Sequence, residues 1–528
     1  MQQEINDIKS AKTAIGIEFG STRIKAVLIG SGNQCLASGS HTWENKLQDG
    51  IWTYSKEDII SGLQSAYRSL SEDIKSKYDI HLEKTGAIGI SAMMHGYIAL
   101  DKNDELLTSF RTWRNNTTAQ ASKKLSKLLE FNIPERWSVS HLYQAILNKE
   151  PHLLSLKKVT TLAGYVHYLL TGENVLGIGD ASGMFPIDSK TLYYNKEMED
   201  KFNKLVRESG YNFTVSDIFP NILTAGECAG HLTKEGAALL DPSGKLTPGI
   251  PLCPPEGDAG TGMVATDSVS KRTGNVSAGT SVFAMVVLEK NLNKVYPQID
   301  IVATPDGAPV AMVHANNCTS EINSWAVLFD DVLKAFSKNV TPDELYSTLY
   351  RSALSGEKDC GGLLPYGYIS GENITETESG RPLFIRRENS SFTLSNLMRA
   401  HMYSALGALK IGLDILFDEE NVAIDKLNCH GGFFKTPEVG QRIMAAAANV
   451  KTSVTAEAGE GGAWGMALLA AFMNDEETVL SDFLSKKVFA DSKTVDIEPS
   501  REDVLGFEKF MESYKKALAL EQNASKYI

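Results

Sequence analysis

The chain has little cysteine, and its cysteines form no recognisable framework. Six cysteines are spread over 528 residues without a CxxC pair. In a chain of this length, isolated cysteines predict reduced thiols rather than a disulfide scaffold, and this favours a reducing compartment.

Blocks of lysine and arginine are also missing. The sequence holds 52 basic and 65 acidic side chains, which gives a formal net charge of −13. Nucleic acid is not expected as a partner, because its phosphate backbone requires a basic surface. A nucleotide ligand remains compatible, since backbone N–H groups and a metal ion can hold its phosphates.

Long apolar runs are absent as well. No uninterrupted apolar stretch reaches the ~18 residues of a membrane span, and the N-terminal sequence MQQEINDIKSAK has no apolar signal core. We therefore expect no membrane partner and a cytoplasmic location. The chain is too long for one ordinary core and its hydrophobic content is an ordinary 42%, which predicts two large domains or a few smaller ones.

The most distinctive stretch that is present is Pro254–Val264, PPEGDAGTGMV. Asp258 follows a proline-rich approach and lies among Gly, Ala and Thr. This composition predicts a turn-forming loop in which a ligand can approach a carboxylate closely. A second small-residue turn, NVSAGTSV, follows at Asn275–Val282.

Two similar turns occur in the two halves of the chain. Ala14–Gly30, AIGIEFGSTRIKAVLIG, predicts a β-hairpin with a Gly-Ser-Thr turn, and a Gly-Thr-Ser turn leads into an apolar strand around Thr280. Backbone N–H groups and hydroxyls in such turns can hold phosphate, although a plain polar hairpin explains the first one equally well. The repetition suggests two halves of similar fold facing a shared cleft.

Two further segments carry candidate ligand-binding side chains. A helix is predicted over Lys56–Lys75 and a buried strand over Ala87–Ile90, which ends in a loop containing His95. His95 can donate a hydrogen bond to a hydroxyl, or it is a core histidine. The segment Phe110–Asn116, FRTWRNN, combines an aromatic ring with polar donors as sugar sites do, and it fits a surface turn equally well.

The remaining elements are expected as follows: a mostly helical Trp137–Leu170; a tight polar loop at Gly177–Asp188 that contains Asp180; a long amphipathic helix over Leu397–Leu416; a strand, Gly turn and helix over Leu427–Asn449; and a Gly-rich entry into a small-residue helix over Ala456–Phe472.

In their order, these segments resemble the FGGY carbohydrate kinases over nearly the whole chain. IEFGSTRIKAVL is similar to the first phosphate motif of that family, and SAMMHGYIALDKND to the Met-His-Gly segment of the D-xylulokinases. GIPLCPPEGDAGTGMVATDSV resembles the region of the catalytic aspartate, and NVSAGTSV the second phosphate loop. LTGENVLGIGDASGMFPID, LLPYGYISGEN, CHGGFFKTPEVGQ and EGGAWGMALLAA complete the series.

The resemblance implies an α/β protein with two actin-like ATPase (ribonuclease-H-like) domains facing a central cleft. Residues 1–265 would bind the sugar and end with the catalytic aspartate, and residues 266–528 would bind the nucleotide. The implied activity is ATP-dependent phosphorylation of a sugar hydroxyl, with a ketopentose such as D-xylulose as substrate and ATP and Mg²⁺ as cofactors.

The resemblance also assigns roles to residues. Asp258 is the expected general base and Glu18 the expected metal ligand. The expected sugar contacts are Met94, His95, Gly96, Trp113 and Asp258. The expected nucleotide contacts are Gly20, Ser21, Thr22, Gly279, Thr280, Ser281, Gly431, Gly432 and Lys435.

The chain departs from the family pattern at three places. Glu18 stands where the family usually has aspartate, Phe433 replaces the third glycine of the adenosine motif, and Asn115–Thr117 replaces an aspartate- and arginine-containing run after Trp113. A kinase for L-ribulose, a polyol or a sugar acid, a non-catalytic sugar- or nucleotide-binding regulator and an actin-like structural ATPase remain alternatives. A homodimer is left open.

Overall fold

The computed structural model describes residues 1–455, 461–475 and 477–528, and the chain divides into two compact units. Unit 1 contains residues 1–269 and 301–310 and the described residues of 461–491. Unit 2 contains residues 270–300, 311–455 and 492–528. Each unit is built on its own central β-sheet.

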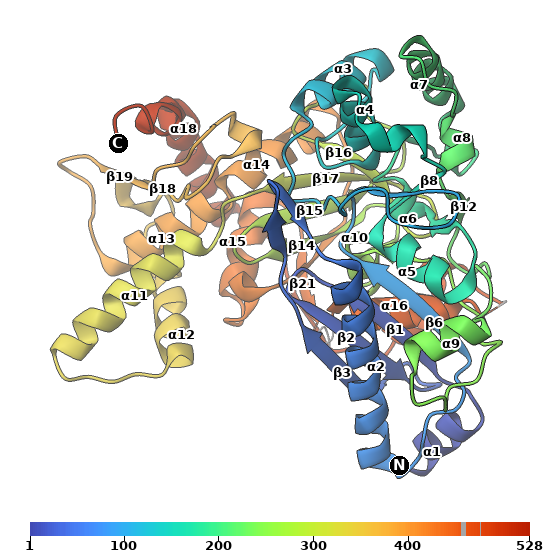
Figure 1. The fold of residues 1–528 in the computed structure, drawn as a ribbon. Coiled ribbons are helices and arrows are strands. Elements are labelled where there is room, and N and C mark those ends of the chain that lie inside the picture. Colours follow the sequence, from blue (N-terminus) through green and yellow to red (C-terminus); the bar gives the residue numbers. More distant parts are fainter. Residues whose placement is uncertain (456–460, 476) are drawn as a thin grey trace. The chain divides into compact units, whose positions relative to one another are not determined.

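The sheet of unit 1 has five strands in the order β13-β6-β1-β2-β3. Figure 1 labels β6, β1, β2 and β3. These are β1 Ala14–Phe19, β2 Arg23–Ile29, β3 Cys35–Thr42, β6 Ala87–Ala92 and β13 Glu256–Gly257. β1 pairs antiparallel with β2 and parallel with β6, and β13 pairs parallel with β6. The carboxyl ends of β1, β6 and β13 therefore share one edge of the sheet, where ligands of α/β proteins commonly bind.

Two helices cover opposite faces of this sheet, and a glycine allows each to approach closely. A Cβ at Gly39 would lie 2.2 Å from the backbone N of Leu70 in α2 (Lys56–Tyr78), and one at Gly16 would lie 2.1 Å from the backbone O of Ala463 in α16 (Gly461–Phe472). Strand pairing places Gly16 and Gly39 on opposite faces. The strand residues between these helices form a fully buried aliphatic core.

The other elements of unit 1 surround this core. Its helices are α1 Gln2–Lys9, α3 Ala119–Leu129, α4 Ser138–Asn148, α5 Leu162–Thr171, α6 Ile178–Ala181, α7 Lys196–Glu208, α8 Val215–Ile218, α9 Lys234–Leu240, α10 Asp258–Val264 and α17 Leu480–Asp482. Its short strands are β4 Lys46–Gln48, β5 Ile51–Thr53, β7 Ile98–Leu100, β8 Lys158–Thr160, β9 Val175–Gly177, β10 Ile187–Asp188, β11 Tyr193–Tyr194 and β12 Asn221–Leu223.

The sheet associated with unit 2 repeats the same arrangement. Its order is β16-β17-β15-β14-β20-β21-β22. β14 pairs antiparallel with β15 and parallel with β20, just as β1 pairs with β2 and β6. The two turns that are similar in sequence thus lie in equivalent hairpins, which confirms the predicted duplication.

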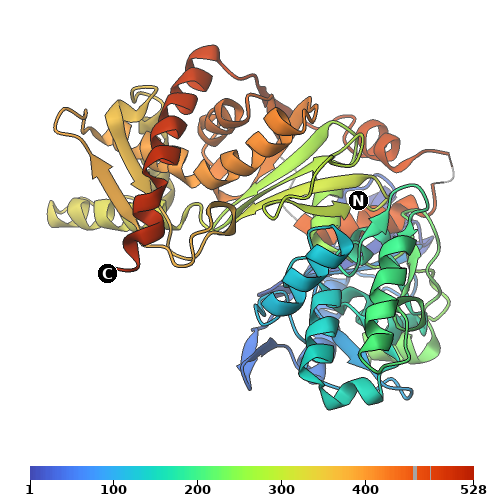
Figure 2. The ribbon, with the colours of Figure 1, turned by 90° about the horizontal axis from the view of Figure 1, so that it is seen from above.

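The strands of this sheet are β14 Thr273–Ala278, β15 Val282–Val287, β16 Asp300–Ala303, β17 Pro309–Ala315, β20 Lys426–His430, β21 Thr452–Thr455 and β22 Thr494–Ile497, and a separate hairpin is formed by β18 Leu363–Tyr366 and β19 Leu383–Arg386. The helices are α11 Ser320–Ala335, α12 Pro342–Ala353, α13 Leu394–Ala405, α14 Gly407–Asp414, α15 Val439–Ala448 and α18 Arg501–Ala524. Figure 2 shows α18, in dark red, beside the orange helices of the same unit.

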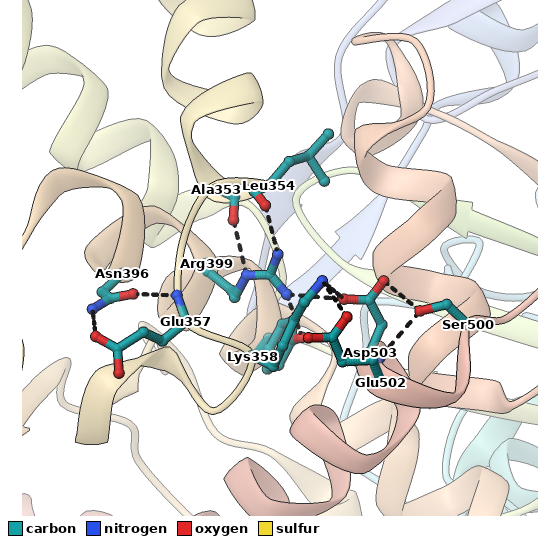
Figure 3. Close-up of polar contacts among 10 residues, drawn as sticks. Ala353, Leu354, Glu357, Lys358, Asn396, Arg399, Ser500, Glu502 and Asp503 are labelled. Carbon is teal, nitrogen blue, oxygen red and sulfur yellow. Dashed lines mark hydrogen bonds and ion pairs between the residues drawn. The ribbon is translucent and has the colours of Figure 1, made fainter.

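A buried arginine attaches α18 to the rest of unit 2 (Figure 3). The guanidinium of Arg399 in α13 donates to the carbonyl oxygens of Ala353 and Leu354 at the end of α12, at 2.8 and 3.1 Å. It also lies 3.3 Å from the carboxylate of Asp503, in the first turn of α18, and Lys358 lies 2.6 Å from the same carboxylate. Asp503 therefore connects three segments that are distant in sequence.

We expect Asp503→Ala to destabilise unit 2 by about 1–3 kcal/mol, because two cations lose a charged hydrogen-bond acceptor. The melting temperature should fall by about 2–6 °C. Asp330→Ala is the control, since it breaks a partly exposed ion pair with Lys334, one turn away in α11, a kind of pair that contributes only about 0–1 kcal/mol. Equal shifts for both variants would contradict the proposed attachment.

Several sequence predictions need correction at the level of elements. Asp258 begins helix α10 rather than lying in a loop, and the predicted polar loop around Asp180 contains the short helix α6. The single helix predicted over Leu397–Leu416 is interrupted at Leu406. The interruption coincides with close packing, because a Cβ at Gly407 would lie 2.6 Å from the ring of Tyr514.

Other expectations are met. None of the six cysteines forms a disulfide, as predicted, and four of them are buried. Within the described part of the chain, no helix combines the length and the apolar character that crossing a bilayer requires.

Candidate active site

Asp258 lies at the shared carboxyl edge of the unit 1 sheet. Strand pairing aligns Phe19 and Gly257 with Ala92 in β6, so the residues that follow these strands emerge side by side. The Oδ1 atom of Asp258 accepts a hydrogen bond from the backbone N–H of Met94 at 3.0 Å. The residue is exposed to solvent, although partial desolvation by the surrounding protein raises the pKa of its carboxyl. Asp258 thus offers a positioned carboxylate that a ligand can reach.

Three further carboxyl groups with raised pKa values belong to the same region: Glu18, Asp180 and Glu256. Desolvation raises the pKa of Glu18 to about 7, and the negative charge of Asp258 adds to this shift. Burial also raises the pKa of Asp180 to about 7, and the charge of Asp258 adds to this shift. The hydroxyl of Thr161 donates to Oδ2 of Asp180 at 2.6 Å and opposes it. Several carboxyl groups with raised pKa values in one place are typical of functional sites.

Glu256, the third of these groups, connects the Asp180 segment to the strand that leads into Asp258. Its carboxylate accepts the backbone N–H groups of Gly179 and Asp180 at 3.1 and 2.9 Å. Burial and the neighbouring Asp180 raise its pKa to about 8. A Cβ at Gly177 would lie 2.2 Å from Glu256 Oε1, so the close approach requires glycine. Sequence reasoning missed Glu256, although the glycines around Asp180 were a signal that another group packs there.

The Met-His-Gly segment lies directly beside Asp258. Besides the bond from its N–H, Met94 packs its side chain against Gly257. His95 is buried, its Nδ1 lies 3.3 Å from the carbonyl oxygen of Gly183, and its ring stacks near Trp137. Gly96 has φ +104°, and a Cβ there would lie 2.7 Å from the carbonyl oxygen of Arg111. The burial of His95 matches its alternative interpretation as a core histidine, and its contact with a sugar stays a prediction.

Trp113 is 39% exposed, and the residues after it have a structural role. The guanidinium of Arg114 lies 4.1 Å from the ring centroid of Trp52 in β5. Asn115 is buried and exchanges two hydrogen bonds with the backbone of Trp52, each 2.8 Å long. Asn115, one of the residues at which the chain departs from the family pattern, therefore holds β5 in place.

The first candidate phosphate turn, Gly20–Thr22, has all three of its carbonyl oxygens bound by protein. The indole N–H of Trp43 donates to Gly20 O, the hydroxyl of Tyr54 donates to Ser21 O, and the backbone N–H of Trp43 donates to Thr22 O, at 2.7, 2.7 and 3.2 Å. The rings of Trp43 and Tyr54 stack at 3.9 Å. With its carbonyl oxygens bound in this way, the turn does not direct them toward an anion.

The second turn, Gly279–Ser281 in unit 2, shows the same property. Gly279 O accepts the backbone N–H and the hydroxyl of Thr319, at 3.0 and 2.8 Å. Thr280 O accepts the N–H of Cys318 at 3.0 Å, and Ser281 O accepts the N–H of Gly279 at 2.9 Å. The two turns therefore share both their position in a hairpin and their bound carbonyl oxygens.

The glycines of the predicted adenosine motif lie next to this second turn. Gly431 has φ +102°, and a Cβ there would lie 2.4 Å from the carbonyl oxygen of Ala278, the residue before the turn. Gly431, Gly432 and Lys435 are exposed. Phe433, which stands in place of the third glycine of the motif, is fully buried and packs against Tyr350. Its aromatic ring therefore lies in the interior of unit 2.

The Gly-rich segment predicted over Ala456–Phe472 is described only in part. Residues 456–460 lie outside the described residues. Helix α16 packs on the unit 1 sheet, where a Cβ at Gly462 would lie 2.1 Å from Glu18 Oε1, and the backbone of Ala463 hydrogen-bonds to that carboxyl. Glu18 is one methylene longer than the usual aspartate, and the absence of a side chain at Gly462 leaves room for its carboxyl group.

The two sheets of the same strand arrangement define the fold class, the two-domain actin-like ATPase fold, which solved structures share over nearly the whole chain. Residues 13–265 match the N-terminal domain of the FGGY family of carbohydrate kinases, and residues 274–473 match its C-terminal domain. The chain belongs to this family and is a xylulokinase-like sugar kinase that uses ATP.

Three relatives are distant in sequence but match over nine tenths or more of their length. The xylulose kinase of Haemophilus influenzae is 23% identical, with 88% of this chain and 91% of that protein covered. The crystal structure of ligand-bound xylulose kinase from Lactobacillus acidophilus gives a TM-score of 0.80 at 17% identity, covering 98% of this chain and 100% of that chain. Gluconate kinase from Lactobacillus acidophilus gives 0.79 at 17% identity, covering 98% and 99%.

Proposed function

We propose that this kinase phosphorylates a hydroxyl of a ketopentose such as D-xylulose, with Asp258 as the general base. The observation that carries the proposal is the carboxylate of Asp258, held by the N–H of Met94 beside His95 and exposed to solvent. Xylulose kinases from several bacteria match most of the chain, which supports the choice of substrate.

In this proposal the protein supplies position and charge rather than covalent chemistry, as phosphoryl transfer requires. Asp258 accepts the proton of the attacking hydroxyl and orients its oxygen. Met94, His95, Gly96 and Trp113 contribute sugar contacts from residues 1–265. The N–H and hydroxyl groups of Ser21 and Thr22 in the first turn, and of Thr280 and Ser281 in the second, bind the phosphates of ATP. The N–H groups of Gly20 and Gly279 are already donated within the protein, to Arg23 O and Ser281 O. Gly431, Gly432 and Lys435 bind the nucleotide from residues 266–528.

Magnesium fits this donor set as a largely hydrated ion. Among the described residues, no cluster of three or more His, Cys, Asp or Glu side chains could hold a metal ion. Mg²⁺ commonly keeps several waters and binds through one or two carboxylates together with substrate phosphates. Glu18, half-buried at the edge of the sheet, is the carboxylate that we assign to it. When bound, the ion would neutralise charge on the phosphates.

A sugar acid is the second candidate substrate. The fold matches gluconate kinase almost as well as xylulose kinase, so the architecture alone does not distinguish them. A carboxylate substrate requires a cationic partner, and Arg114 near Trp113 is already placed over the ring of Trp52. A stacked guanidinium keeps its N–H donors, so the preference for a ketopentose rests on the xylulose kinases that match most of the chain.

The test is a panel of ketoses, polyols and sugar acids, each incubated with the protein and Mg-ATP while ADP release is measured. We expect D-xylulose to give a kcat/KM at least ~10-fold above that of any sugar acid, because a missing hydrogen-bond partner costs about 1–3 kcal/mol. A higher kcat/KM with gluconate would reassign the substrate. ATP turnover independent of every sugar would contradict the proposal.

A further inference from the structure

Glu372 is a buried acid that the proposed mechanism does not use. It lies after β18, in a segment that forms a short bridge with Thr377, and it is 0% exposed. Its Oε2 atom accepts three N–H donors: the backbone N–H groups of Asn316 and Asn317, at 2.8 and 3.2 Å, and the side-chain amide of Asn317, at 3.1 Å. Three hydrogen bonds to one carboxylate oxygen hold Asn316 and Asn317 in place.

Asn317 reinforces this connection from the other side. Its Oδ1 accepts the backbone N–H groups of Ile369 and Ser370, at 2.9 and 3.0 Å. Its Nδ2 also donates to the carbonyl oxygen of Ser370 at 3.3 Å. Because Asn317 is itself buried, these bonds compete little with water, and they hold the segment after β17 against the segment that contains Glu372.

The two residues that follow Asn317 hold the second phosphate turn. Cys318 donates its N–H to Thr280 O, and Thr319 donates both its N–H and its hydroxyl to Gly279 O. Only one or two peptide bonds separate these donors from Asn317, so displacing Asn317 would displace the support of the turn.

We infer that Glu372 is a positioning residue for the binding of ATP phosphates at Gly279–Ser281, acting through Asn317, Cys318 and Thr319. The inference rests on the proposed function of that turn. Fixing the carbonyl oxygens of the turn keeps the N–H and hydroxyl groups of Thr280 and Ser281 organised before ATP arrives, and preorganisation of this kind raises affinity.

The experiment measures MgATP binding by calorimetry, and KM for ATP and for the sugar, in Glu372→Ala and Glu372→Gln. Glu372→Ala should raise both the Kd and the KM for ATP about 10-fold, which corresponds to the loss of one charged hydrogen bond, with the KM for the sugar unchanged. Glu372→Gln keeps an oxygen acceptor and should recover most of this loss.

Glu521 provides a matched control. It is also a fully buried acid of unit 2, and it accepts the N–H of Arg381 without contacting the turn. Glu521→Ala should lower the melting temperature without changing ATP affinity. The inference is overturned if the alanine variants at positions 372 and 521 change ATP affinity equally, or if Glu372→Ala lowers only the melting temperature.

A second pair of variants tests the connection directly. Thr319→Val removes the hydroxyl that donates to Gly279 O and should raise the Kd for MgATP, whereas Thr319→Ser should not. If the wild-type protein binds no MgATP, the proposed function of the turn fails first. If it binds MgATP and none of the variants at Glu372 or Thr319 changes the Kd, the positioning role alone fails.

Discussion

Asp258→Asn is expected to lower kcat by about 10²–10⁴-fold, the usual contribution of a general base. The amide cannot accept the proton of the attacking hydroxyl, while its oxygen still accepts the N–H of Met94, as the carboxylate does. Folding and sugar binding should therefore be retained. The measurements are sugar-dependent ADP release for kcat, calorimetry for the sugar Kd and the melting temperature for stability.

A matched control is Asp217→Asn. Asp217 also lies in the first turn of a short helix of unit 1, where it forms a capping box with Thr214, and its variant should keep the kcat of the wild type. If Asp258→Asn turned over at the wild-type rate, Asp258 would have no role as a base. If it lost sugar binding in proportion to kcat, Asp258 would be a binding residue instead.

The pH profile supplies an independent readout. Desolvation raises the pKa of Asp258, so the acidic limb of kcat/KM should lie above the range of an ordinary aspartate. Glu18, with a pKa near 7, also titrates in this region. The limb belongs to Asp258 only if it disappears from the residual activity of Asp258→Asn, and its persistence would assign it to another group.

The sequence predicted the strands and turns of the two hairpins better than it predicted the contacts that hold them. The hairpins around Ser21 and Thr280 are visible as apolar strands flanking a small polar turn, because strand propensity and turn chemistry are local properties. The donors that bind the turn carbonyl oxygens, Trp43 and Tyr54, lie more than 20 residues away in sequence. Their role depends on tertiary packing, and no local pattern encodes it.

Buried acids are the second feature that local reasoning misses. Glu256 and Glu372 are fully buried or nearly so, whereas glutamate is normally an exposed residue type. Each is stabilised by backbone N–H groups from a segment far away in the chain.

The position of α16 on the unit 1 sheet is a third feature that local sequence patterns do not predict, because the contact at Gly16 joins residues more than 400 positions apart.

The buried carboxyl groups should also make the stability of unit 1 depend on pH. The pKa of Asp180 is about 7 in the folded protein, against 3.8 for the ordinary side chain. The folded state therefore favours the protonated form. Its stabilising contribution is complete below pH 3.8 and is lost as the pH rises through 7, at about 1.4 kcal/mol per pH unit within that window.

Asp180→Asn removes this titration, because the amide stays neutral and keeps an oxygen for the hydroxyl of Thr161. The buried NH₂ group replaces an Oδ1 that has no hydrogen-bond partner, and this lowers stability by an amount that does not depend on pH. Relative to the wild type, however, it should gain stability as the pH rises. We expect the melting temperature of the variant minus that of the wild type to increase by about 5 °C between pH 5 and pH 8.5.

The difference between variants is the informative quantity, because other groups oppose the trend. Burial lowers the pKa of His141 to about 3 and that of His167 to about 4, so the neutral histidines stabilise the folded protein increasingly as the pH rises toward 6.5. Their effect is common to the wild type and the variant and cancels in the difference.

Asp241→Asn supplies the control of opposite sign. Burial of Asp241 opposes ionisation, but hydrogen bonds from Ser243, Leu246 and Lys245 together lower the pKa of its carboxyl. Its stabilising contribution is therefore present above pH 3.8 and is lost only at lower pH. Between pH 5 and 8.5 the melting-temperature difference for Asp241→Asn should stay constant. A constant difference for Asp180→Asn as well would mean that Asp180 is already ionised at pH 5 in the folded protein, with solvent or a cation compensating its charge.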